Sequence, residues 1–231
     1  MRIKIKLSKT DKMLPINNQH IVNSFIHRAL GKDNKYHDSI SNYCVSSLRG
    51  GKWIKGTSNI SLSNGGYIVV SSMDNEFMDK IILGVLSTPF YQDIKVDGFE
   101  FIEEKFHNGW NNFATLSPFI IRERKSDGRN HFVTLRDDDF TEKVQQHIKR
   151  KVSKANPTLN TQNIKVEVKE HSKHKVKRIL IKNVTNFANQ CQISIYCDRK
   201  VAELLYNIGI GQSTGSGFGT IHKTENYNVY K

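Results

Sequence analysis

The stretch GIGQSTGSGFGTI, residues 209–221, places five glycines in thirteen positions. Glycine inside regular structure costs roughly 0.5–1 kcal/mol relative to alanine, so such a cluster indicates special dihedral angles or a close approach of the backbone to another group. The absence of lysine between Gly209 and Thr220 excludes a phosphate-binding loop of the Walker type. Thr214 stands where a dinucleotide-binding fingerprint requires its third glycine, which excludes that motif as well. A flexible turn is the remaining local explanation.

Regular elements are predicted on the N-terminal side of the glycines and directly after them. Four segments carry apolar residues at helical spacing, over 17–31, 74–86, 139–155 and 198–208, and Asp74 and Asp198 are placed to cap two of these helices. Strands are predicted over 2–7, 43–48, 66–72, 93–103, 113–122, 163–169, 176–184, 191–197 and 218–223. The glycine stretch therefore joins the last helix to the last strand.

The order of these elements indicates the fold. Strand, helix, two strands, helix and strand is the ferredoxin-like order, in which two helices cover one face of a four-stranded antiparallel sheet. The order occurs twice, so we predict an α+β protein of two tandem ferredoxin-like (RRM-like) domains, residues 1–110 and 111–231, with the glycine-rich loop in the second. HNGWNN, residues 107–112, has loop composition and marks the predicted boundary. The strand CQISIYC, residues 191–197, exceeds this order by one, and we expect it to extend a hairpin.

The charge of the chain indicates a polyanionic partner. The 231 residues include 35 Lys and Arg against 22 Asp and Glu, which gives a formal charge of +13 and a pI near 9.6. Each phosphate that a basic surface neutralises releases condensed counterions, and this gain accumulates over many contacts. A basic protein from a lysine-rich proteome is the alternative explanation.

Other classes of protein are disfavoured by the composition. No apolar run reaches the length of about 18 residues that spans a bilayer, and the basic start MRIKIKLSK alternates instead of opening an apolar signal core, so we expect no membrane association and a cytoplasmic location. Cys44, Cys191 and Cys197 show no C-x-x-C spacing, so neither a disulfide framework nor a metal site is indicated, and no cofactor motif is present. We expect Cys191 and Cys197 to pack in a core.

Several motifs together resemble one family, the CRISPR-associated endoribonucleases that cut repeat RNA into guides. Gly209-Ile210-Gly211, then QSTGS, then Gly217-Phe218-Gly219 matches the family's G-h-G-x5-G-h-G loop before the final strand. The resemblance also covers four shorter motifs and with them nearly the whole chain: IHRAL at 26–30, YHDS at 36–39, VSSLRGG at 45–51 and TLSP at 115–118. It implies CRISPR repeat RNA as the partner. It leaves open whether the protein works alone, as a homodimer or within a CRISPR effector complex.

The resemblance also implies a reaction without a metal ion. The ribose 2′-hydroxyl attacks the adjacent phosphorus and leaves a 2′,3′-cyclic phosphate and a 5′-hydroxyl, which requires a base, an acid and a group that stabilises charge on the phosphorus. Histidine suits both proton transfers because its pKa lies near neutrality. By resemblance, His37 is the general base and His27 the general acid, although the two roles could be exchanged. Lys52 or Arg49 would stabilise the charged phosphorane.

RNA contacts are expected at the loop and at basic side chains. Backbone without side chains lets successive amides approach a phosphate, so the predicted contacts are Gly209, Gly211, Gln212, Ser213, Thr214, Gly215, Ser216, Gly217 and Gly219. Arg49, Arg122 and Arg124 are further candidates for phosphate contacts. The helix over 139–155 has a basic surface that could lie along an RNA stem, formed by Lys143, His147, Lys149, Arg150, Lys151 and Lys154. A solvated helix face is the alternative for these residues.

Two other functions remain open from the sequence. A repeat-RNA-binding subunit of the same superfamily would share the glycine loop and hold a guide without cutting it. Cyclic phosphodiesterases with two H-x-Ser/Thr motifs also use paired ferredoxin-like lobes, and the chain contains His37-Asp38-Ser39 and His222-Lys223-Thr224.

Overall fold

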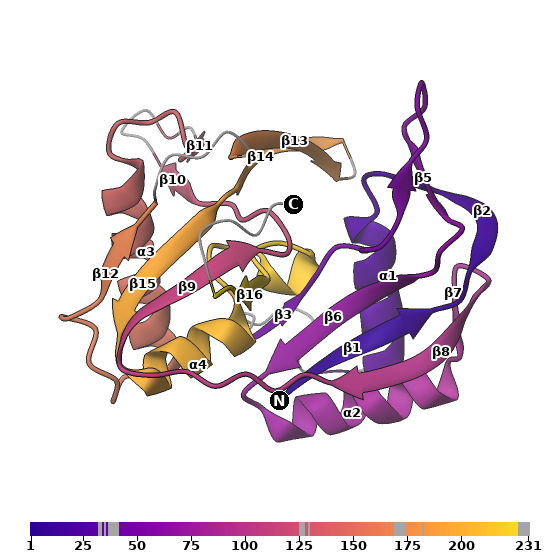
Figure 1. The fold of residues 1–231 in the computed structure, drawn as a ribbon, viewed down its shortest axis with the longest axis horizontal. Coiled ribbons are helices and arrows are strands. Elements are labelled where there is room, and N and C mark those ends of the chain that lie inside the picture. Colours follow the sequence, from indigo (N-terminus) through magenta and orange to yellow (C-terminus); the bar gives the residue numbers. More distant parts are fainter. Residues whose placement is uncertain are drawn as a thin grey trace. The chain divides into compact units, whose positions relative to one another are not determined.

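The chain folds into two compact units that repeat one strand order (Figure 1). The computed structural model describes residues 1–31, 34, 36, 42–124, 128, 130–168, 174–181 and 183–225. Unit 1 comprises Met1–Glu103 together with Gly215–Gly217, and unit 2 comprises Glu104–Thr214 and the chain from Phe218 onward. Strand β9, Gly109–Thr115, runs through the sequence position at which the domain boundary was predicted.

Unit 1 has the ferredoxin-like element order. Its elements are β1 (Arg2–Leu7), α1 (Gln19–Leu30), β3 (Tyr43–Val45), β6 (Gly66–Ser72), α2 (Asn75–Ser87) and β8 (Ile94–Phe101). The sheet has the antiparallel order β3-β6-β1-β8, extended at its edge by the short strand β7 (Phe90–Tyr91). Asp74 caps α2 through a hydrogen bond from the Phe77 amide to its side chain, as the sequence predicts.

The core of unit 1 lies between the sheet and its two helices. Ile3, Ile5 and Leu7 alternate along β1 and are buried with the apolar stripe of α1. The helices approach so closely that a Cβ on Gly84 would lie 1.9 Å from the carbonyl oxygen of Ala29. Leu86, the last apolar residue of the segment 74–86 predicted as a helix, is 62% exposed, and the buried residues of α2 end at Val85.

A second, three-stranded sheet in unit 1 was not predicted. It has the order β2-β5-β4, from β2 (Thr10–Pro15), β5 (Asn59–Leu62) and β4 (Lys52–Trp53). The sequence TDKMLP of β2 does not alternate between apolar and polar residues, and only Leu14 of this strand is buried. Strand β4 has two residues, and both are exposed. Neither strand therefore carries the period-two signal on which strand prediction depends.

Unit 2 repeats the ferredoxin-like order. Its elements are β9, α3 (Phe140–Ala155), β12 (Lys165–Glu167), β15 (Gln192–Cys197), α4 (Arg199–Ile208) and β16 (Ile221–Lys223), and the antiparallel sheet has the order β12-β15-β9-β16. The apolar faces of α3 and α4 are buried against this sheet, and Cys191 and Cys197 are buried in the same core, as expected. The predicted α+β class with two ferredoxin-like units is confirmed.

One strand assignment in unit 2 was wrong. The strand at 192–197, expected to extend a hairpin, is the sheet strand β15, paired with β9 on one side and β12 on the other. The additional hairpin is formed by β13 (Lys175–Ile181) and β14 (Val184–Gln190), and a single antiparallel bridge joins Asn189 of β14 to Phe119. Both segments alternate in sequence, and only the tertiary structure shows which one pairs with β9.

Smaller differences concern the connections. Residues 109–112, predicted as loop, already belong to β9. A short hairpin of β10 (Arg122–Arg124) and β11 (Asn130–Phe132) precedes α3, and a 3-10 turn, Thr214–Ser216, lies inside the glycine stretch. Within the described ranges, no helix combines the length and apolar character needed to cross a membrane, and no cluster of three or more His, Cys, Asp or Glu could hold a metal ion.

Candidate nucleic-acid interface

The glycine-rich loop begins where α4 ends. Gly209 adopts a φ of 71° and its amide donates to the carbonyl of Leu205, which closes the helix. The Ile210 amide then donates to the carbonyl of Gly219 across 2.9 Å and joins the two ends of the loop. A Cβ on Gly219 would lie 1.8 Å from the Ile210 carbonyl oxygen, so this position excludes every side chain.

The loop is fastened to the segment that follows β9. The amides of Gln212 and Gly219 donate to the carbonyls of Ile120 and Pro118, at 2.8 and 3.0 Å. The amides of Leu116 and Ser117 both donate to the Thr220 carbonyl, so the TLSP motif at 115–118 is the structural partner of the end of the loop. Motif and loop therefore form one local structure.

These contacts revise the expected role of the loop amides. The amides of Gly209, Ile210, Gln212 and Gly219 already donate to protein carbonyls, so they are used inside the protein and do not form the predicted anion-binding concavity. Thr214 and Gly215 are buried, whereas Gln212, Ser213 and Ser216 are half-buried. The glycines allow the loop to pack tightly, and the loop presents polar side chains between them.

Arg122 joins two of the predicted RNA-binding side chains of the loop. Its backbone amide and its Nε both donate to Oε1 of Gln212, at 3.1 and 3.2 Å, and Nη2 reaches Oγ of Ser213 at 3.3 Å. Gln212 returns a hydrogen bond from Nε2 to the Arg122 carbonyl. Arg124, the next outward position on the same strand, is also exposed. Arg122, Gln212 and Ser213 thus form one polar cluster, which we name the arginine–loop cluster.

Helix α3 holds the opposite side of the loop. Lys151 Nζ donates to the Gly211 carbonyl at 3.0 Å and to Oγ1 of Thr214 at 3.4 Å. One turn earlier, the ring of His147 lies near the backbone of Gly211, and its buried Nε2 has no hydrogen-bond partner among the described residues. Burial lowers the pKa of His147 to about 4 and outweighs the opposing effect of the Gly211 backbone, which raises it. His147 is therefore neutral at pH 7, and Lys151 is the side chain of α3 that holds the loop.

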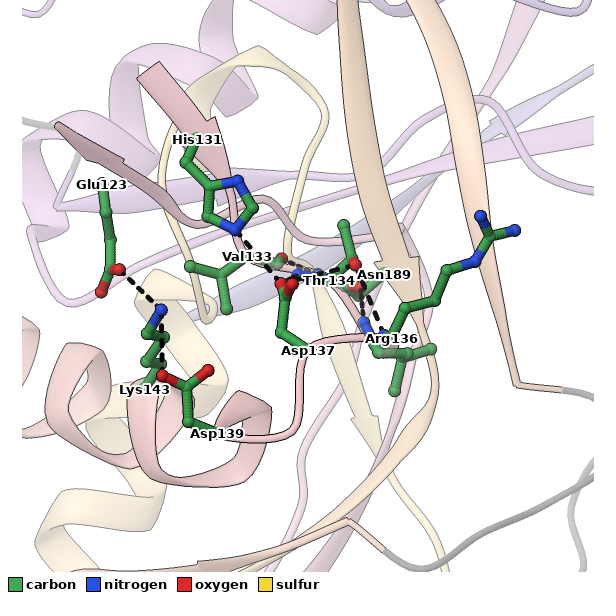
Figure 2. A network of polar contacts seen from close by, with 10 residues as sticks. Glu123, His131, Val133, Thr134, Arg136, Asp137, Asp139, Lys143 and Asn189 are labelled. Carbon is green, nitrogen blue, oxygen red and sulfur yellow. Dashed lines mark hydrogen bonds and ion pairs between the residues drawn. The ribbon is translucent and has the colours of Figure 1, made fainter. Parts of the chain in front are cut away.

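Charged residues at and before the start of α3 take part in a network of polar contacts (Figure 2). Lys143 bridges Glu123 of β10 and Asp139, both at 3.1 Å, and the hydrogen bonds to Glu123 and then Asp139 raise its pKa. Beside it, Asp137 accepts from the Thr134 amide and lies 3.4 Å from the His131 ring.

Asn189 of β14 holds the segment of residues 133–135, which precedes Asp137. It donates to the Val133 carbonyl and accepts from the Leu135 amide. The residues that were predicted to form a basic RNA-binding surface on α3 thus include two, Lys143 and Lys151, that hold neighbouring segments of unit 2. This role was not predicted, and its local signal is that the two lysines are eight residues apart and so lie on one face of the helix.

In unit 1, the start of α1 gathers two predicted RNA-binding segments. Oδ1 of Asn18 accepts from the Leu48 amide at 3.0 Å, next to Arg49. Arg49 pairs with Tyr67 through two backbone hydrogen bonds of 2.9 Å and its side chain is half-buried. The tip of the glycine loop belongs to the same unit, and a Cβ on Gly217 would lie 2.9 Å from Cγ of Gln19.

The predicted catalytic residues are placed on different elements. His27 is half-buried in the last turn of α1. Lys52 is exposed on β4, opposite Ser61 in the three-stranded sheet. His37, the predicted general base, lies outside the residues that the structure describes, and His222 of the alternative H-x-Thr motif lies half-buried on β16. Their catalytic roles therefore stay predictions.

Two ferredoxin-like units of one strand order, with a glycine loop fastened beside the first strand of the second unit, define an α+β protein of the tandem ferredoxin-like class. A family model described as "CRISPR associated protein Cas6, C-terminal" matches residues 101–222, which is more than half of the chain. The chain belongs to the Cas6 family, and the resemblance inferred from its motifs is confirmed.

The similarity to known proteins covers nearly the full length of the chain. A curated relative, "CRISPR-associated endoribonuclease Cas6 1" of Methanocaldococcus jannaschii, is 25% identical over 99% of this chain and 94% of its own length. A Cas6-related protein from Pyrococcus furiosus has a TM-score of 0.84 at 21% identity, covering 98% of this chain and 99% of its own. A structure titled "An RAMP protein binding different RNA substrates" has a TM-score of 0.83 at 22% identity and covers 97% and 100% of the two chains. Both structures share the fold described above.

Proposed function

We propose that this protein is an endoribonuclease that cleaves CRISPR precursor RNA within the repeat. Membership of the Cas6 family supports the class of activity, and the M. jannaschii relative is named as an endoribonuclease of that family. The observation that carries RNA as the substrate is the arginine–loop cluster, which lies within the region that the family model matches. Its guanidinium group and hydroxyl are donors suited to phosphate oxygens.

The proposed reaction is an internal transesterification. The 2′-oxygen of the nucleotide before the cut forms a bond to the adjacent phosphorus while the bond from phosphorus to the 5′-oxygen breaks. A base takes the 2′ proton and an acid delivers a proton to the departing oxygen, so the products are a 2′,3′-cyclic phosphate and a 5′-hydroxyl. No water or metal ion takes part in this balance.

Each role is assigned to a residue of unit 1. His37 is the base and His27 the acid, or the reverse, because an imidazole near neutral pH can serve in either form. Lys52 or Arg49 stabilises the charge that builds on the phosphorus. The arginine–loop cluster and Arg124 hold the RNA backbone.

Cleavage of a labelled repeat RNA in EDTA tests the reaction. We expect one cut that ends in a cyclic phosphate, blocked by a 2′-deoxy substitution at the cut site. His37→Ala should lower the rate by about 10²–10⁴-fold, the usual contribution of a general acid or base, and should leave RNA binding unchanged. His27→Ala should have a similar effect, while His20→Ala, an exposed histidine on the same helix, serves as the control. A metal requirement, or a product without the cyclic phosphate, would contradict the mechanism.

Two outcomes would replace the proposal with an alternative. Binding of the repeat without cutting by the wild type would indicate a repeat-RNA-binding subunit. Hydrolysis of small cyclic phosphates without cutting of the repeat would indicate a phosphodiesterase with two H-x-Ser/Thr motifs.

The RNA contact is tested separately with a matched pair of arginines. Arg122→Ala should weaken binding of the repeat several-fold and reduce the salt dependence by about one phosphate contact. Arg136→Ala removes the same charge from an exposed position in the connection before α3 and should leave affinity within two-fold, about the scatter of such measurements. Equal losses of affinity in the two variants would show that Arg122 contributes only its positive charge and makes no specific contact with the RNA.

A further inference from the structure

The sheet of unit 2 has a face that its helices do not cover. Phe113, Ile193, Ile195, Val166 and Ile221 point toward α3 and α4 and are buried in the core. Side chains alternate along a strand, so the neighbouring residues point to the opposite face, among them Trp110 and Asn112 of β9, Ser194 and Tyr196 of β15, Lys165 and Glu167 of β12 and His222 of β16.

Trp110 and Tyr196 form an aromatic pair on this open face. They lie directly opposite each other in the β9–β15 ladder, and their ring centroids are 5.5 Å apart in a T-shaped arrangement. Lys165 lies opposite Tyr196 on the other side of β15, with Nζ 5.9 Å from the centre of the tyrosine ring. The open face therefore carries two aromatic rings and a cation on three neighbouring strands.

The exposure of this pair is not explained by packing. Each ring is 39% exposed, whereas Phe113, Ile193 and Ile195 on the same two strands are fully buried. Farther along the open face, Ala114 and Gln192 are buried, so the accessible part of the face is the end that carries the rings. A polar pair lies between the two rings and this buried end of the face, in which Ser194 Oγ donates to Oδ1 of Asn112 at 2.6 Å.

This arrangement fits unpaired nucleotides. Every base has a flat face that stacks on aromatic side chains, and sheet-based RNA readers place such aromatics on the two central strands. β15 and β9 are the two central strands of the order β12-β15-β9-β16. Lys165, directly beside Tyr196, supplies a cation for a phosphate, whereas the Glu167 carboxylate lies farther from the rings, opposite Ser194. The half-buried Asn112 supplies an amide group that can hydrogen-bond a base edge, and the formal charge of +13 favours RNA over a neutral protein partner.

We propose that Trp110 and Tyr196, with Lys165, form a stacking platform for a single-stranded segment of the RNA. The platform consists of side chains other than those of the arginine–loop cluster and the predicted catalytic residues. It rests on the proposed function, because the bound segment belongs to the same precursor RNA. Its contribution is to affinity for unpaired nucleotides and not to the chemical step.

The test uses the fact that the chain has two tryptophans, Trp53 and Trp110. In a Trp53→Phe background, Trp110 is the only tryptophan, and a base stacked on it should quench its fluorescence. The probe is a short unstructured oligonucleotide of the repeat sequence with 2′-deoxy sugars, which cannot be cut by 2′-hydroxyl attack. We expect saturable quenching that follows binding measured independently by fluorescence anisotropy of the labelled oligonucleotide.

Substitutions separate stacking from general effects. Tyr196→Ala should weaken binding of the oligonucleotide about ten-fold, and Tyr196→Phe, which keeps the ring, should stay within two-fold of wild type. Phe187→Ala removes an exposed aromatic of the same unit, from β14, and should leave affinity unchanged. At saturating repeat RNA, the cleavage rate of Tyr196→Ala should equal that of wild type.

Three results would overturn the platform. Binding by anisotropy without a change in Trp110 fluorescence would show that the bases stack elsewhere, while the proposed function stands. Equal losses for Tyr196→Phe and Tyr196→Ala would show that the hydroxyl and not the ring matters. A change in oligomeric state on Trp110→Ala, measured by sedimentation without any effect on RNA, would assign the face to a second copy of the chain. Failure of the wild type to bind or cut any repeat RNA would instead remove the proposed function itself.

Discussion

The two units share one strand order and carry additional strands at the same two connections, but these strands pair differently. Between the first strand and the first helix, unit 1 has β2 and unit 2 has the β10–β11 hairpin; between the second and third strands of the main sheet, unit 1 has β4 and β5 and unit 2 has the β13–β14 hairpin. In unit 1 the additional strands join in one sheet, β2-β5-β4, whereas in unit 2 they form two separate hairpins. In both units, the four strands of the main sheet keep their order. The comparison shows that connections can grow without disturbing the buried layer, which is why binding residues concentrate on them.

The units also differ in how their helices are held. In unit 1, α1 and α2 approach until the backbone of Ala29 touches Gly84, so steric fit sets the helix layer. In unit 2, two lysines of α3 reach neighbouring segments, Lys143 to the β10 hairpin and Lys151 to the glycine loop, and the buried His147 lies between them on the helix. The stability of unit 1 should therefore be most sensitive to added side-chain volume. The stability of unit 2 should also depend on pH and on salt concentration.

The largest effect is expected from Gly84→Ala in unit 1. The added Cβ would lie 1.9 Å from the Ala29 carbonyl oxygen, so the helices must separate, and we expect a loss of more than about 3 kcal/mol in the free energy of unfolding. Leu83→Ala, one residue away and 65% exposed, should change this free energy by less than about 0.5 kcal/mol. Denaturant titrations of both variants measure the difference, and similar values would show that the helix contact is not tight.

The counterpart in unit 2 is Gly219→Ala. The Cβ would lie 1.8 Å from the Ile210 carbonyl oxygen at a φ of 67°, but a loop can shift more easily than two packed helices, so we expect a loss of about 2–3 kcal/mol. RNA binding should fall at the same time because the arginine–loop cluster moves. Gly56→Ala, at a φ of 80° with no atom within 4 Å, isolates the dihedral strain, which should be about 1–2 kcal/mol. Equal losses at both positions would rule out the steric contact as the cause.

A pH effect of intermediate size is expected from His147. Its pKa is lowered to about 4 in the folded protein, against an ordinary value of 6.5, so the unfolded chain binds the proton more tightly between these values. Stability should therefore be full above about pH 6.5 and decline as the pH falls toward 4. The free energy of unfolding of His147→Gln should lie about 1 kcal/mol below that of wild type at pH 7, because the packing of the buried ring is lost, and the two values should approach each other toward pH 4. Free energies of unfolding of wild type and His147→Gln that differ by a constant amount between pH 4 and 6.5 would contradict the lowered pKa of His147.

The smallest effect is expected from Lys143→Met. Two carboxylates share this ammonium group at a partly exposed site, so we expect a loss of about 0.5–1 kcal/mol at low salt and less at high salt. Lys80→Met in unit 1 breaks one exposed pair with Glu76 on α2 and should lose about 0.3 kcal/mol. Unfolding measured at two salt concentrations compares them, and a larger loss for Lys80→Met would reverse the contrast between the units.

The sequence predicted features that depend on neighbouring residues. Helical spacing located the buried stripes of α3 and α4, Asp74 was identified as a cap, and the glycine spacing together with four shorter motifs indicated the family. These signals are local, because a helix face repeats every 3.6 residues and a cap lies within one turn of the groups that it satisfies.

Tertiary structure decided which distant groups meet. Three sets of contacts join parts of the chain that no local pattern connects: the pairing of β9 with β15 and not with the β13–β14 hairpin, the hydrogen bonds of the loop amides to residues 118–120, and the contacts of Lys143 and Lys151. Trp110 and Tyr196 likewise become neighbours only when β9 pairs with β15. The composition gave the charge and the periodicity gave the elements, but pairing across a sheet depends on the summed burial of both faces, which a single segment does not contain.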